Sequence, residues 1–137
     1  QKNIIKLVTN DDENHLFKND LLWSYLLSVQ VFINQNKLDQ ALIYLDKARV
    51  LINTLKSSAT KATKIIRANV YLLQYQARTM FLLKQKQSAL MAITESIKLF
   101  KQHLSVNTDT SFYARIMLTK LSILSATDNI DNAFTGN

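Results

Sequence analysis

Apolar positions recur every three or four residues along nearly the whole chain, which is the spacing of one face of an α-helix. Residues 65–102 contain two such segments, and a short polar sequence at residues 85–87 separates them. Two helices joined by about three residues have to fold back antiparallel. The pattern therefore predicts a helical hairpin, with its first helix ending near Lys84 and its second beginning at Ser88.

The same periodicity continues on both sides of this hairpin. The expected helices lie at about residues 10–35, 38–55, 61–84, 88–103, 108–125 and 130–134. Asn10 and Glu13 have the spacing of a capping box, so Asn10 is expected to begin the first of these helices. Asn36 is expected to close it in the left-handed conformation. Turns are predicted at residues 57–60 and 127–129, and a loop at 104–108.

The hairpins share a repeated pattern of side chains. Tyr25, Phe32, Ala41, Leu45 and Ala48 recur 48 residues later as Leu73, Met80, Ala89, Ile93 and Ser96. Met117, Leu124 and Ala133 repeat the first three positions after another 44 residues. A self-match of this length predicts a helical repeat array within a single domain, residues 1–137. Its expected parts are the end of a preceding helix at 1–9, repeats at 10–56 and 57–104, and a partial repeat at 108–137.

In each copy, two large residues stand seven apart on the first helix, and Ala-x-x-x-apolar follows on the second as Ala41/Leu45 and Ala89/Ile93. This spacing resembles the tetratricopeptide repeat (TPR), with a period longer than its usual length of about 34 residues. The resemblance implies an all-α, right-handed superhelix of antiparallel helix pairs with a period of 44 to 48 residues. The stretch after Arg67, NVYLLQYQARTMFLLKQKQSALMAITESIKLF, is also similar to the helical arm of MalT-type bacterial transcription regulators and to sensory TPR modules.

Composition agrees with the all-α expectation. Proline is absent and the single glycine is Gly136, whereas strand-rich folds need turn formers at every reversal. There is no cysteine, and the longest apolar run, Leu21–Ile33, has 13 residues, too few to span a bilayer. No signal peptide opens the chain, so we expect a cytoplasmic protein without a membrane partner. Because the chain starts at Gln1 and the last repeat is incomplete, we expect a fragment of a longer protein.

The net charge of +7 is concentrated in the middle of the chain. Residues 56–103 carry nine Lys or Arg and a single acid, Glu95, whereas the remaining residues carry eight bases and nine acids. This imbalance indicates an anionic partner, although lysine-rich helices are also commonly just solvated surface.

In TPR-like stacks the first helices of successive repeats line a concave groove, so the resemblance implies a binding site on their non-core face. Besides Leu26, Ile33, Leu118, Ser122 and Ser125, that face carries the candidate groove residues Trp23, Gln30, Lys64, Arg67, Tyr71, Gln74, Arg78, Phe81 and Arg115. Cations beside aromatic residues suit an extended acidic peptide. The alternative is structural: the aromatic residues pack between repeats and the arginines are solvated.

We therefore expect a non-catalytic protein- or peptide-binding scaffold within a regulatory or signalling protein. No cofactor, metal site or enzymatic activity is expected, because His15 and His103 are 88 residues apart, Asp11, Asp12 and Glu13 read as a solvated helix start, and no internal glycine forms a phosphate loop. Two alternatives stay open: an effector-sensing or oligomerising arm of a bacterial regulator, and nonspecific nucleic-acid binding through the basic middle hairpin. Homodimerisation through exposed repeat ends is a further expectation.

Overall fold

The computed structural model describes the backbone of residues 2–56 and 62–135, and the side chains of residues 17–56 and 63–126. These residues form five helices: α1 (Lys2–Asn34), α2 (Leu38–Lys56), α3 (Ala62–Leu82), α4 (Lys86–His103) and α5 (Thr110–Thr135). The all-α class is confirmed. The turn predicted at residues 57–60 lies outside the described residues. Within the described part, no helix has the length and apolar character that crossing a bilayer requires.

The two hairpin turns, after α1 and after α3, have the same backbone geometry. Asn36 and Lys84, which are 48 residues apart, both adopt the left-handed conformation, with φ of 58° and 63°. In each turn the left-handed residue and its successor donate their N–H groups to carbonyls in the last turn of the preceding helix. The distances are 3.0 and 2.8 Å after α1, and 3.0 and 2.9 Å after α3. This is a Schellman motif, and it confirms the predicted conformation of Asn36.

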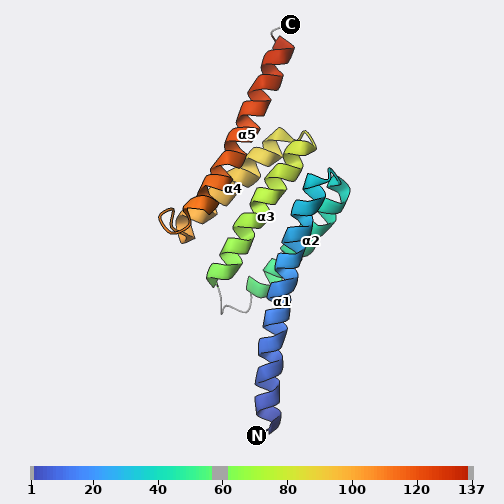
Figure 1. Cartoon of the computed structure of the whole chain (residues 1–137), viewed down its shortest axis with the longest axis vertical. Coiled ribbons are helices and arrows are strands. Elements are labelled where there is room, and N and C mark those ends of the chain that lie inside the picture. Colours follow the sequence, from blue (N-terminus) through green and yellow to red (C-terminus); the bar gives the residue numbers. More distant parts are fainter. Residues whose placement is uncertain (1, 57–61, 136–137) are drawn as a thin grey trace.

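Helix α3 lies at the centre of the molecule and packs against all four other helices, while α1 and α5 extend beyond it toward opposite ends (Figure 1). Ala68, Leu72 and Tyr75 of α3 belong to one core, with α1 and α2. Val70 and Ala77, on the other side of α3, belong to a second core with α4 and α5. The fold therefore has two adjacent hydrophobic cores that share one helix.

The alanines of the predicted motif lie where the second helix of each pair meets the first. Ala41 and Ala89 are fully buried, and Leu45 and Ile93 one turn later are buried beside them. A methyl group at these positions allows the two helix backbones to approach closely. The side chain of Ala133, their predicted third counterpart, lies outside the described side chains.

The predicted helix start at Asn10 and the predicted turn at residues 127–129 are both wrong. α1 runs without a break from Lys2, and α5 runs without a break to Thr135. Asn, Asp and Thr each weaken a helix interior by about 0.7 kcal/mol or less, and neither segment contains Gly or Pro. Capping residues of this kind permit a helix end without enforcing one. Residues 1–9 are consequently part of α1, and residues 130–134 are part of α5.

The buried stripe of α1 consists of Leu22, Leu26, Val29 and Ile33. Leu26 and Ile33 were expected on the groove face, and that expectation is wrong because α1 packs against α3 as well as α2, which widens its buried arc. Tyr25 and Phe32 are half-buried, and their rings contact Tyr44 of α2 at centroid distances of 5.8 and 5.4 Å.

Burial in α5 follows that of α3 with the 44-residue spacing. Phe112 and Ile116 lie 44 residues after Ala68 and Leu72, and all four are buried. Thr79 and Ile123 are a further buried pair with this separation. Ala68 and Leu72 of α3 pack in the core with α1 and α2. Phe112, Ile116 and Ile123 of α5 pack in the core with α3 and α4. The spacing therefore assigns structural counterparts on α3 to the positions on this side of α5, whereas Gln74 and Ala77 are buried and their counterparts Leu118 and Leu121 are exposed.

Candidate functional site

Aromatic contacts connect α1, α3 and α5. The ring of Tyr71 on α3 meets Trp23 of α1 edge-on at 5.5 Å, and it stacks on Phe112 of α5 at 4.2 Å with an angle of 18°. Pairs of this geometry stabilise a fold by about 0.5–1.5 kcal/mol beyond their burial. Trp23 and Tyr71, two of the predicted groove residues, are therefore half-buried parts of the helix packing.

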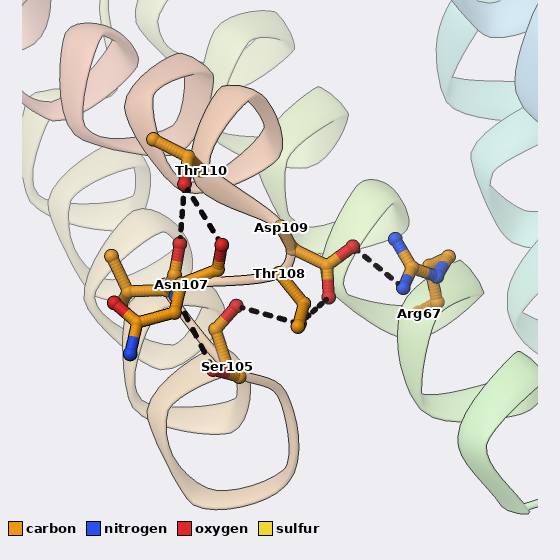
Figure 2. A network of polar contacts seen from close by, with 7 residues as sticks. Arg67, Ser105, Asn107, Thr108, Asp109 and Thr110 are labelled. Atoms are coloured by element: carbon orange, nitrogen blue, oxygen red, sulfur yellow. Dashed lines mark hydrogen bonds and ion pairs between the residues drawn. The ribbon is translucent and has the colours of Figure 1, made fainter.

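Arg67 is held by the start of α5 (Figure 2). Its Nη2 lies 2.8 Å from Oδ1 of Asp109, and its guanidinium lies 5.6 Å from the centre of the Phe112 ring. The approach to α5 is ordered locally, since the Thr110 hydroxyl donates to the carbonyl of Val106 at 2.7 Å. Arg67, a predicted groove residue, thus has a carboxylate partner within the protein and anchors α5 to α3.

Tyr75 lies at the centre of a polar cluster that spans α1, α3 and α5. Its hydroxyl donates to Oε1 of Gln30 at 3.4 Å, and Nη2 of Arg78 donates to Oδ1 of Asn34, also at 3.4 Å. Burial and the neighbouring Tyr71 raise the pKa of the Tyr75 hydroxyl above its ordinary value of 10.0, while the charges of Arg115 and Arg78 partly oppose that rise.

The two arginines of this cluster come from different helices, Arg78 from α3 and Arg115 from α5, and both lie close enough to Tyr75 to act on its charge. Across the described side chains, neither forms an ion pair. Arg78 is half-buried and Arg115 is exposed. Their guanidinium groups are consequently able to bind an external anion.

Gln74 is buried, at 2% exposure, although the sequence placed it among the groove residues. Its Nε2 donates to the hydroxyl of Thr119 at 3.1 Å, which joins α3 to α5. Its Oε1 is buried and has no hydrogen-bond partner among the described groups. Gln74 therefore acts within the α3–α5 contact rather than on the surface.

A hollow of about 260 Å³ opens between α3 and α5. It is lined by Arg78, Phe81, Leu82, Leu118, Thr119, Ser122 and Ile123. Leu82 and Leu118 are 43% and 62% exposed, so the wall of the hollow presents apolar surface to solvent. Phe81, a predicted groove residue, is half-buried and forms part of this wall.

Two other surface hollows differ in how many of the candidate groove residues line them. One of about 350 Å³ is lined by Tyr71, Arg115 and residues 108–112, beside the start of α5. One of about 480 Å³ lies at the first hairpin turn, lined by residues 36–40 and Leu83, and contains none of them. Lys64 is exposed near the start of α3 and forms no ion pair with another described residue.

The predicted residues thus fall at several places: Gln30 and Arg78 take part in contacts between α1 and α3, and Arg78 and Phe81 line the hollow between α3 and α5. Arg115 lines the hollow beside Asp109, the partner of Arg67. The sequence analysis did not identify Tyr75, which bonds to Gln30 and is affected by the charges of Arg78 and Arg115. A signal was present, because Tyr75 follows Tyr71 by one helical turn and precedes Arg78 by three residues.

This arrangement offers hydrogen-bond donors and an apolar hollow, a combination that recognises a ligand with both carboxylate and apolar groups. Across the described residues, no group of three or more His, Cys, Asp or Glu is placed to hold a metal ion. Comparison of the chain with protein-family models, with curated proteins and with solved structures found no match.

Proposed function

We propose that the protein is a non-catalytic scaffold that binds an acidic protein segment or peptide along the face shared by α1, α3 and α5. In this proposal the helix pairs form a TPR-like, right-handed stack that belongs to a regulatory or signalling protein. One observation carries the proposal: Arg78 of α3 and Arg115 of α5 both act electrostatically on Tyr75, and neither has a carboxylate partner among the described residues.

The chemistry of the cluster suits carboxylates. Each guanidinium presents several N–H donors in one plane and can bind a carboxylate through two parallel hydrogen bonds. Hydrogen bonds to charged groups contribute about 1.5–3 kcal/mol each, more than neutral ones. Gln30 and Asn34 add amide groups that can bind the backbone of an extended peptide, beyond their contacts to Tyr75 and Arg78.

The positions of these groups are set by the packing beneath them. Tyr71 stacks on Phe112, and Arg67 pairs with Asp109, so α3 and α5 are joined at several points. The spacing between Arg78 and Arg115 is therefore determined by helix packing rather than by a loop. A receptor with preformed geometry loses less conformational entropy on binding, which raises affinity.

Charge reversal tests the proposal. The variant Arg78→Glu/Arg115→Glu should weaken binding of a fluorescein-labelled acidic nonapeptide by at least about tenfold, measured by fluorescence anisotropy. Helicity by circular dichroism should be unchanged. The matched control is Lys64→Glu, an exposed cation on the same helix but outside the cluster, for which we expect a change below about twofold. Equal affinity in the double variant, or an equal loss in Lys64→Glu, would overturn the proposal.

Nonspecific nucleic-acid binding by the basic region 56–103 is the competing function. It predicts an affinity for any single- or double-stranded probe that falls by orders of magnitude between about 50 and about 200 mM salt. The scaffold proposal predicts instead that binding depends on peptide sequence and on Arg78 and Arg115. A gel-shift assay at the two salt concentrations separates the two functions.

A further inference from the structure

The α1–α3 contact and the α3–α5 contact differ in the size of the side chains that lie in them. Between α1 and α3, the side chains of Tyr75 and Arg78 cross the interface and reach Gln30 and Asn34. Tyr75 is only 6% exposed, so its ring fills the space beside α1. At this contact, therefore, large side chains of α3 occupy the space against α1.

At the second contact, between α3 and α5, the corresponding side chains are small. The 44-residue spacing assigns Thr119 to the position of Tyr75 and Ser122 to the position of Arg78. Both small residues line the hollow of about 260 Å³. Two hydroxyl side chains therefore line the hollow at the positions where α3 carries a phenol ring and a guanidinium.

The size and lining of the hollow point to the group that it can hold. An apolar cavity of about 150 Å³ is enough for benzene, so an open hollow of about 260 Å³ can accept a leucine, methionine or phenylalanine side chain. Phe81, Leu82 and Leu118 provide apolar walls, and Arg78 adds a cation to the same lining. A fully apolar occupant would leave this cation without a carboxylate partner, whereas an apolar side chain next to a carboxylate can fill the hollow and pair with Arg78.

We propose that the hollow between α3 and α5 binds a large apolar side chain of the peptide, and that Arg78 binds an acidic residue next to it. The recognised element is then a Leu, Met or Phe adjacent to Asp or Glu, within an extended acidic segment. This inference rests on the proposed function and specifies its ligand.

Two labelled nonapeptides test this pairing. Both are acidic, and they differ only in the central residue, which is Leu in one and Gly in the other. The wild-type protein should bind the Leu peptide at least about tenfold more tightly, since burial of a leucine side chain is the difference between them.

Filling the hollow should remove that preference. Ser122→Phe places a ring in the hollow and leaves the hydrogen bond between Gln74 and Thr119 intact. Thr119→Tyr is a second variant, which introduces the residue found 44 positions earlier. Each should bind the Leu and Gly peptides with equal affinity, close to that of the wild type for the Gly peptide. Leu121→Phe is the matched control, because Leu121 is an exposed residue of α5 outside the hollow.

The outcomes separate this inference from the proposed function. If the acidic peptides bind and Arg78→Glu/Arg115→Glu abolishes binding, but Leu and Gly peptides bind the wild type equally, only the hollow assignment is overturned. A preference for Leu that persists in both filled variants overturns it as well. If neither peptide binds the wild type, the proposed function and this inference fail together.

Discussion

Arg67 of α3 and Asp109 at the entrance to α5 form an ion pair of 2.8 Å between residues 42 positions apart in the sequence. Both side chains are partly shielded from water, at 34% and 19% exposure. The Arg67 guanidinium also lies over the Phe112 ring. An ion pair and a cation–π contact therefore occur together where α5 packs against α3.

This ion pair should contribute measurably to stability. We expect Arg67→Gln and Asp109→Asn each to lower the free energy of unfolding by about 1 kcal/mol, because the pair is partly buried rather than fully exposed. Urea denaturation of both single variants and the double variant gives the coupling energy, expected to be at least about 0.5 kcal/mol. Strictly additive losses would show that the two residues act independently.

Replacement of Lys84 by glycine should stabilise the protein. Its φ of 63° is unfavourable for a residue with a side chain, whereas glycine adopts this conformation readily. Lys84→Gly should therefore raise the unfolding free energy by about 0.5–1 kcal/mol, less the entropy that glycine adds to the unfolded chain. Asn36→Gly should change it less, because asparagine tolerates the left-handed region.

Thermal and urea denaturation of these variants check the turn geometry. Lys98→Gly serves as the control, because residue 98 lies inside α4, where glycine should lower stability by about 1 kcal/mol. A loss of stability in Lys84→Gly similar to that in Lys98→Gly would contradict the left-handed assignment.

Tyr75 should make stability fall at high pH. Burial raises the pKa of its hydroxyl above 10.0, so the folded protein retains this proton at pH values where the unfolded chain loses it. The contribution of Tyr75 to the free energy of unfolding is fully present below pH 10.0 and is lost as the pH rises through the folded-state pKa. From about pH 9 to about pH 11, the wild type should lose more unfolding free energy than Tyr75→Phe. Parallel stability curves for the two proteins would contradict this prediction.

The helical class and the hairpins could be predicted from the sequence, because periodicity is a local property. Asn36 was predictable for a similar reason, since asparagine is one of the residues that enter the left-handed region. Lys84 was not, because lysine carries no such preference; only its position 48 residues after Asn36 indicates it. The ends of α1 and α5 were mispredicted because capping residues are weak signals without glycine or proline.

Less of the candidate site than of the fold could be predicted from the sequence. Arg67 was assigned to the groove by its helical position, but its role depends on Asp109, which lies in a loop that periodicity does not describe. Gln74 was assigned in the same way, although α5 covers it. A helix wheel locates the face of one helix, whereas the burial of a residue on a central helix depends on the neighbours on both sides.

The central position of α3 has a consequence for how the molecule comes apart. α3 borders both hydrophobic cores, so unfolding of α3 would expose the apolar surfaces of α1 and α2 and of α4 and α5 at the same time. Separation of α1 and α2 alone, or of α4 and α5 alone, would leave one long side of α3 in water. The helices on both sides of α3 should accordingly unfold together with it in a single concerted transition.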